Sequence, residues 1–258
     1  MSSIIAVMNH KGGTSKTTTA ASLAVALIEL GQKPVLLIDS DHTRALSTSF
    51  GVVPGEGEKT LYEALLERGV TLKRAIRHVR EGLDLVPASR DLSAAEILLS
   101  TTPGGDVMLQ KALQPVRADY AMILIDCPPA LGKLTINALT AADGVLVPVT
   151  PAYLSLNPLE EVFATIEAVK ERLNPRLRVL GILLTQFNQH TLHHREVEER
   201  VRTLYPDLLF PQIVPWTIRL QEAPAGGQTI LDYQPSHPAA MAHREAAKEV
   251  LQRAHQAH

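Results

Sequence analysis

Short apolar runs alternate with longer segments of helical periodicity along this 258-residue chain. The runs cover residues 4–8, 35–38, 83–86, 121–125, 145–149 and 179–184, with a weaker run at 208–210 and 213–214. Runs of this length, rich in Val, Ile and Leu, are typical of strands buried on both faces of a parallel sheet. The pattern therefore predicts a central, mostly parallel sheet.

Helical periodicity fills the intervals between these runs, over residues 16–30, 91–99, 106–114, 134–141, 156–173, 191–204 and 238–255. The clearest apolar stripe lies in the segment 156–173 and consists of Val162, Phe163, Ile166, Val169 and Leu173. Gly31 is placed to end the first long helix. Because alternating strands and helices favour parallel strands joined by crossovers, we expect an α/β fold whose twisted sheet carries helices on both faces.

No internal repeat, low-complexity tract or linker divides the chain, so residues 1–258 are interpreted as one domain, with a surface loop at 51–59. A formal charge of −2 means that any nucleic-acid binding must come from a local patch. The single cysteine, Cys127, excludes a disulfide framework within the chain. The first strand follows Met1 almost directly and no apolar run reaches ~18 residues, which predicts a cytoplasmic protein without a signal or a spanning helix.

The segment between the first strand and the first helix has the composition of a phosphate-binding loop. It reads Asn9-His10-Lys11-Gly12-Gly13-Thr14-Ser15-Lys16-Thr17-Thr18-Thr19. In a strand–turn–helix unit, backbone N–H groups and the helix dipole favour an anion, a lysine adds charge, and the following hydroxyl can bind Mg²⁺. The strict nucleotide-binding pattern has glycines where this chain has His10 and Ser15.

Acidic residues follow two of the other predicted strands. Asp39 and Asp41 end the run 35–38, and Asp126 ends the run 121–125. Each could simply cap a loop, which is a common use of aspartate. Ligands of layered α/β proteins gather at the carboxyl ends of the strands, so acids there beside a glycine–lysine turn indicate a nucleotide site with Mg²⁺.

These motifs resemble the ParA family of partition ATPases, the short, Soj-like type, in the deviant Walker A P-loop group that includes MinD. The matching stretches run in order along nearly the whole chain: Lys11-Gly12-Gly13-Thr14-Ser15-Lys16-Thr17-Thr18-Thr19, Leu36–Asp41, Ile123-Leu124-Ile125-Asp126-Cys127-Pro128-Pro129, Thr135–Leu139, Ala141–Asp143, Val147–Val149 and Ile218–Pro224. The resemblance implies a P-loop ATPase fold, with ATP and Mg²⁺ as cofactors.

The resemblance also implies roles for single residues. Lys16 would contact the β- and γ-phosphates, Lys11 would reach the nucleotide of the partner subunit in an ATP-sandwiched homodimer, and Asp41 would position the attacking water. Thr17 would bind Mg²⁺, with Asp39 and Asp126 behind it. Gly12, Gly13, Thr14, Ser15 and Thr18 complete the loop, and Asn188 and Pro215 would lie at the adenine pocket.

Two departures from the family pattern concern the rate of ATP hydrolysis. Ser15 replaces the glycine before the P-loop lysine, and a serine at a positive φ costs on the order of 1–3 kcal/mol. After Asp41 the family usually has Pro-Gln-Gly-Asn, whereas this chain has His42-Thr43-Arg44-Ala45. We expect these changes to leave ATP binding intact and to affect hydrolysis and switching.

The resemblance further implies nonspecific DNA binding by ATP-bound dimers, association with the nucleoid, and segregation of a chromosome or plasmid. A ParB-like centromere-binding protein would stimulate hydrolysis. The candidate DNA contacts are Arg195, Arg202 and Arg219, pooled into one surface although glutamates interleave with them. For any one of these arginines, an ordinary solvated helix face is the competing interpretation.

Other functions remain as alternatives. An ATP-bound positioning scaffold with little hydrolysis would share the same loop. A MinD-like membrane-associated ATPase would need a bulky, basic amphipathic tail, which residues 251–258 do not provide. His190, His193 and His194 have the spacing of a helical metal site, but we favour the interpretation that they are three surface polar residues.

Overall fold

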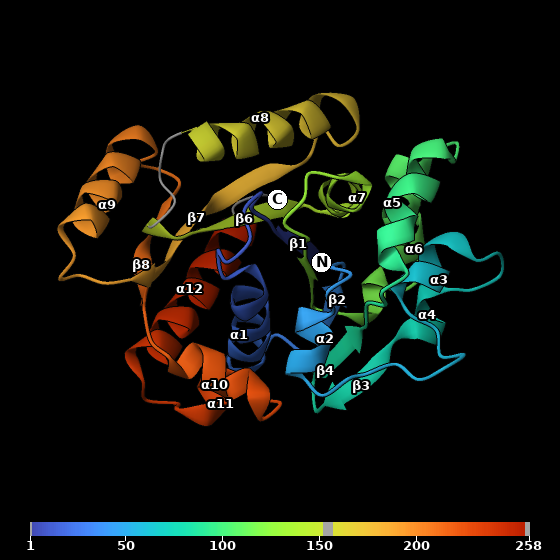
Figure 1. The fold of residues 1–258 in the computed structure, drawn as a ribbon, viewed down its shortest axis with the longest axis horizontal. Helices are drawn as coiled ribbons and strands as arrows, with labels where there is room; N and C mark the ends of the chain where they lie inside the picture. Colours follow the sequence, from blue (N-terminus) through green and yellow to red (C-terminus); the bar gives the residue numbers. More distant parts are fainter. Residues whose placement is uncertain (1, 152–156, 256–258) are drawn as a thin grey trace.

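The computed structural model describes residues 2–151 and 157–255, and it is built on one eight-stranded sheet (Figure 1). The strand order is β3-β4-β2-β5-β1-β6-β7-β8, and every neighbouring pair is parallel except β3–β4. The strands are β1 Ser3–Val7, β2 Val35–Asp39, β3 Arg77–Arg80, β4 Leu83–Val86, β5 Met122–Asp126, β6 Gly144–Val149, β7 Arg178–Phe187 and β8 Leu209–Pro215. The predicted mostly parallel sheet is confirmed.

Helices cover both faces of this sheet. On one face lie α3 Leu61–Leu66, α4 Leu72–Ala75, α5 Leu92–Thr101, α6 Met108–Leu113, α7 Lys133–Ala141, α8 Asn157–Arg172 and α9 Leu192–Leu204. On the other lie α1 Lys16–Glu29, α2 Ala45–Ser49, α10 Arg219–Ala225, α11 Ile230–Tyr233 and α12 Pro238–His255. Two 3-10 turns, η1 Gly105–Val107 and η2 Arg117–Asp119, complete the elements. Figure 1 shows α1 and α12 on the opposite side of the sheet from α7 and α8.

The alternation of side chains along the central strands explains why two helical layers are needed. In β1, Ile4 and Ala6 pack into one apolar core while Ile5 and Val7 pack into the other. Successive residues of a strand point to opposite faces, so an apolar strand such as this one must be covered on both sides. The continuous apolar runs in the sequence are therefore the signature of this two-sided burial.

Each predicted apolar run is a strand, and the weak run at 208–214 is the continuous edge strand β8. The predicted stripe of α8 packs inward, with Val162, Ile166 and Val169 buried. The segment 106–114 is a 3-10 turn followed by the short helix α6. The sequence did not predict β3 or the short helices α2, α3, α4, α10 and α11, because β3 is a charged, half-exposed edge strand and the helices have one or two turns.

Strand register brings the predicted site segments to one edge of the sheet. Val7 and Asp39 both lie opposite Asp126, on either side of β5. The loops that follow β1, β2 and β5 therefore leave the sheet side by side at its carboxyl edge, where ligands of such folds bind. None of the helices in the described part of the chain is long and apolar enough to cross a membrane.

Candidate nucleotide site

The loop between β1 and α1 is tied down by its own polar side chains. Asn9 donates from Nδ2 to the carbonyl of Pro148 at 2.7 Å and accepts the backbone N–H of Lys11 at 3.1 Å. The Thr14 hydroxyl donates back to the Lys11 carbonyl at 3.1 Å. These bonds anchor the loop to the end of β6 and curl it over the first turn of α1, which leaves an anion site at that helix N-terminus.

Two residues of this loop have left-handed backbone conformations. Gly13 has φ 75° and Ser15 has φ 62° with ψ 25°. Ser15 therefore does adopt the positive φ for which a strain on the order of 1–3 kcal/mol is expected. Gln186 Nε2 donates to the Ser15 hydroxyl at 2.8 Å and to the Gly13 carbonyl at 3.0 Å.

Lys16 begins α1 and turns its side chain back into the loop. Its Nζ donates to the Lys11 carbonyl at 2.9 Å, and the residue is 7% exposed. Burial lowers the pKa of Lys16, and the nearby Asp126 and Asp41 oppose this shift. The ammonium is therefore held among acids in the place where a phosphate would complete its coordination.

Thr17 and Asp126 form the base of the site. The Thr17 hydroxyl donates to Asp126 Oδ2 at 2.7 Å, whereas the buried Oδ1 has no hydrogen-bond partner among the described residues. Complete burial and the nearby Asp39 raise the pKa of Asp126 well above its usual range, against the pull of Thr17 and Lys16. An unsatisfied buried carboxylate oxygen beside a hydroxyl fits a hydrated Mg²⁺, which prefers oxygen ligands and keeps several waters.

Asp39 uses both of its oxygens inside the protein. Oδ2 accepts the backbone N–H of Ser47 at 2.8 Å and the Ser47 hydroxyl at 2.6 Å, and Oδ1 accepts the N–H of Asp41 at 3.2 Å. Burial raises the pKa of Asp39 to about 6, although the Ser47 hydrogen bonds oppose this shift. Asp39 thus fastens α2 to the end of β2, a structural contact that sequence reasoning did not foresee.

Asp41 is buried near Lys16 and Asp126, on the loop that departs from the family pattern. Its Oδ1 accepts the backbone N–H of Thr43 at 2.9 Å and lies 3.6 Å from His42 Nδ1. Arg44 has φ 62°, so this chain places an arginine in a conformation that favours glycine. The segment from Asp41 to Arg44 is thereby a tight turn leading into α2.

The predicted adenine residues do come together. Asn188 and Pro215 line one cavity of about 620 Å³ at the ends of β7 and β8. Phe187, Ile213 and the 58%-exposed Trp216 add apolar surface to it. A base could stack in this cavity while its phosphates reach the loop, because β7 contacts that loop through Thr185 and Gln186.

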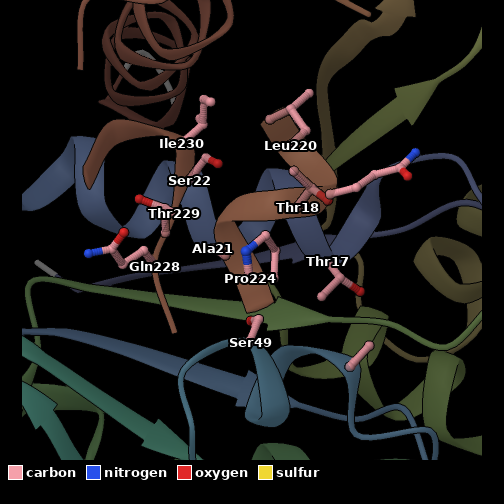
Figure 2. Close-up of a pocket in the computed structure, with 12 residues that line it drawn as sticks. Thr17, Thr18, Ala21, Ser22, Ser49, Leu220, Pro224, Gln228, Thr229 and Ile230 are labelled. Atoms are coloured by element: carbon pink, nitrogen blue, oxygen red, sulfur yellow. The ribbon is translucent and has the colours of Figure 1, made fainter. Parts of the chain in front are cut away.

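A smaller cavity of about 280 Å³ lies between α1 and α10 (Figure 2). Thr17, Thr18 and Ser22 of α1 form one wall, and Leu220 and Pro224 of α10 form the facing wall. Ser49 of α2 closes one end. The cavity lies beside the phosphate loop and joins α1 to the segment that follows Asp41.

Of the candidate DNA contacts, Arg195 and Arg202 are exposed and Arg219 is partly exposed, and they differ in their partners. Arg195 and Arg202 lie two turns apart on one face of α9, and Arg219 begins α10. Arg202 pairs with Glu198 at 2.8 Å and Arg219 pairs with Glu222 at 2.6 Å. Arg195 has no acidic partner among the residues that the structure describes.

The histidine alternative finds no support. His194 Nδ1 accepts the backbone N–H of Asn188 at 2.9 Å, which engages that ring in a local turn. Within residues 2–151 and 157–255, no three His, Cys, Asp or Glu side chains are arranged to hold a metal. The same finding means that any Mg²⁺ at Thr17 would depend on phosphate and water oxygens for most of its ligands.

Sequence reasoning missed two residues that shape the site, Ser47 and Gln186. Neither belongs to a motif. Ser47 reaches Asp39 over 8 residues and Ala88 over 41, and Gln186 reaches Ser15 over 171. The only signal that could have pointed to Gln186 was Ser15 itself, since a serine in place of glycine needs support.

The sheet order, the glycine-containing loop after β1 and the acids at the neighbouring strand ends are those of a P-loop NTPase fold. A family model described as "AAA domain" matches residues 2–179. The chain belongs to the ParA family of partition ATPases. It is 38% identical to "Chromosome partitioning protein ParA" of Caulobacter vibrioides over 97% of this chain and 94% of that protein.

Further comparisons agree with this assignment. The chain is 40% identical to "Chromosome-partitioning ATPase Soj" of Thermus thermophilus over 98% of this chain and 97% of that protein. Among solved structures, it resembles cobyrinic acid a,c-diamide synthase from Mycobacterium smegmatis with bound ADP and magnesium. The TM-score is 0.85 at 35% identity, over 98% of this chain and 95% of the other.

Proposed function

We propose that this protein is a partition ATPase that binds Mg·ATP at residues 9–18, dimerises around it, and binds DNA without sequence preference in that state. Its cargo would be a chromosome or plasmid, and it would act as one domain associated with the nucleoid. The observation that carries the proposal is the Thr17–Asp126 pair, with an unsatisfied buried oxygen, beneath a loop that presents Lys16.

The chain's own residues can hold a triphosphate in a defined way. Lys16 would exchange its bond to the Lys11 carbonyl for the β- and γ-phosphate oxygens, while the backbone of Gly12 to Thr18 surrounds them. Mg²⁺ bound at the Thr17 hydroxyl would neutralise charge on the phosphates. Asp126 would keep Thr17 oriented through Oδ2 and accept a water at Oδ1.

Asp41 is proposed to orient the attacking water. Its carboxylate lies near Lys16, and one oxygen is already fixed by the Thr43 N–H. Asp39 would act indirectly, by holding α2 and the backbone of Asp41 through its bonds to Ser47 and Asp41. Asn188 and Pro215 would take the adenine, and Lys11 would contact the partner's nucleotide, so that dimerisation senses the γ-phosphate.

The proposal predicts DNA binding that depends on the nucleotide state. The experiment measures DNA retention without nucleotide and with ADP, ATP or a slowly hydrolysed analogue, each across a salt series. We expect binding only with ATP or the analogue, with a steep fall as salt rises, because phosphate contacts release counterions. Equal binding in all nucleotide states would refute the proposal.

The role of Asp41 is tested by Asp41→Ala, with the exposed Asp91→Ala as the matched control. We expect Asp41→Ala to keep ATP-dependent dimers and to lower turnover by roughly a hundredfold, in the range of lost general-base catalysis. Dimers are measured by light scattering, and turnover is measured with DNA and a ParB-like partner.

Two outcomes would redirect the assignment. Background turnover in the unaltered protein, even with DNA and partner, would favour the positioning scaffold over the ATPase. Turnover that depends on a cobyrinic acid substrate would point instead to the activity named for the Mycobacterium smegmatis relative.

A further inference from the structure

Two residues with strained backbones meet between the phosphate loop and β7. Ser15 has φ 62° and Gln186 has φ 53°, and the two side chains are hydrogen-bonded at 2.8 Å. The same Gln186 nitrogen donates to the Gly13 carbonyl at 3.0 Å. A carbonyl can only accept, so this contact also requires the amide nitrogen, not its oxygen, to face the loop.

The strain at Gln186 coincides with a break in the sheet. The register of β7 against β8 shifts between Leu184 and Phe187, as expected for a bulge that re-aims a side chain. The preceding Thr185 hydroxyl also reaches the loop, 3.4 Å from the Thr14 carbonyl. The residues that follow, Phe187 and Asn188, line the predicted adenine cavity.

The conformation of Ser15 sets the direction of the phosphate loop. Its carbonyl accepts the Thr19 N–H at 2.8 Å, which starts α1, while its own side chain makes no helix cap. A serine without external support favours negative φ, and such a change would turn the loop N–H groups and Lys16 away from their common focus. A glycine at this position would need no such support.

We propose that Gln186 is a positioning residue that braces the phosphate loop by holding Ser15 in its left-handed conformation, which couples the adenine cavity to the phosphate site. This inference rests on the proposed nucleotide binding at residues 9–18. A glycine would adopt this left-handed conformation without support, whereas in this chain the hydrogen bond from Gln186 holds Ser15 in it.

The test is a double-mutant cycle on the full chain. Gln186→Ala, Gln186→Glu, Ser15→Gly and the double variant Ser15→Gly/Gln186→Ala are compared with the exposed Gln114→Ala as control. Equilibrium affinity for Mg·ADP and for Mg with a slowly hydrolysed ATP analogue is measured, together with KM, kcat and thermal unfolding.

We expect Gln186→Ala to weaken nucleotide binding about tenfold, the usual size of one or two lost hydrogen bonds. Gln186→Glu should lose at least as much, because a carboxylate cannot donate to the Gly13 carbonyl. Ser15→Gly should bind at least as tightly as the unaltered protein. The Gln186→Ala loss should be smaller in the Ser15→Gly background, where only the bond to the Gly13 carbonyl is left to lose. Gln114→Ala should change nothing.

Unchanged nucleotide affinity in both Gln186 variants would refute the proposal that Gln186 positions Ser15. An equal loss of affinity from Gln186→Ala with and without Ser15→Gly would refute it as well. If Gln186→Ala fails to fold, the nearly isosteric Gln186→Glu carries the test. Failure of the unaltered protein to bind Mg·ADP would instead refute the proposed function, so the two failures are distinguishable.

Discussion

Charged side chains at the carboxyl edge of β2 and β5 are buried among protein partners, whereas those on the outer face of α9 are exposed. Asp39 and Asp126 are fully buried, and each has at least one oxygen bound by a hydroxyl of the chain. On α9, Arg202 pairs with Glu198, one turn away, and Arg195 is exposed.

The difference shows where the fold constrains chemistry. A buried charge is costly unless hydrogen bonds compensate it, so the positions of the strand-end acids follow from the packing around them. An exposed ion pair contributes about 0–1 kcal/mol and leaves the side chains nearly free. The packing of the fold therefore fixes the site, whereas the exposed face of α9 that carries Arg195 and Arg202, here called the arginine face, is proposed to contribute only pooled charge.

The largest expected difference is in nucleotide affinity, between variants of the buried Lys16 and of the exposed Arg202. Lys16→Ala should weaken binding of Mg with a slowly hydrolysed ATP analogue several hundredfold, on the order of 3–4 kcal/mol, because it removes charge-assisted bonds to the β- and γ-phosphates. Arg202→Ala should leave that affinity unchanged. Isothermal titration measures both, and equal affinities in the two variants would end the assignment of the phosphate loop.

A second contrast uses histidines. His243 in α12 is 1% exposed and burial lowers its pKa to about 4, although a hydrogen bond with the Ala239 carbonyl opposes the shift. In the unfolded chain this imidazole takes up a proton near pH 6.5, whereas in the folded protein it does so only near pH 4. The contribution of the neutral imidazole to the free energy of unfolding is therefore fully present above pH 6.5, and it is lost as the pH falls towards 4, by roughly 3 kcal/mol in total.

Denaturant unfolding across this pH range measures the effect. His243→Leu should flatten the pH dependence whatever its stability at pH 7, and the exposed His193→Gln on α9 should leave the profile as it is. A profile that keeps its slope in His243→Leu would assign acid sensitivity to other groups.

Hydroxyls give a third, smaller contrast. Ser47 donates to Asp39 and accepts the Ala88 N–H at 3.1 Å, so Ser47→Ala leaves two buried groups short of a partner. We expect a loss of about 2 kcal/mol in the free energy of unfolding. The surface Thr203 on α9, which donates to the Glu199 carbonyl, is the control, and Thr203→Ala should cost below ~0.5 kcal/mol.

The smallest expected effect is at the arginine face. Arg195→Ala should weaken DNA binding by less than ~1 kcal/mol, equally for all sequences, and lower the salt slope by about one unit. Arg202→Ala should do less, because Glu198 already neutralises that charge. A loss confined to one DNA sequence would contradict nonspecific contact by this face.

Much of the fold and of the site could be predicted because the relevant signals are local. Continuous apolar runs report strands buried on both faces, and the loop at 9–18 and the strand-end acids carry their chemistry in adjacent residues. The missed edge strand β3 is polar and half exposed, so it lacked that signal. The Gln186–Ser15 pair could not be predicted, because it forms only when distant segments pack. The Ser47–Asp39 pair spans 8 residues, but no motif marks it and it depends on how α2 packs against the end of β2.

By itself, the sequence determined which segments form the main strands and helices, the nucleotide motif and the family. Periodicity and motif spacing are properties of neighbouring residues, so they can be recognised without the fold. Only the tertiary structure decided that Ser15 is left-handed, that Gln186 holds it from β7, and that Asp126 keeps one oxygen unsatisfied beneath the loop. The physical reason is that hydrogen-bond satisfaction and backbone strain depend on which distant groups meet, and packing alone sets that.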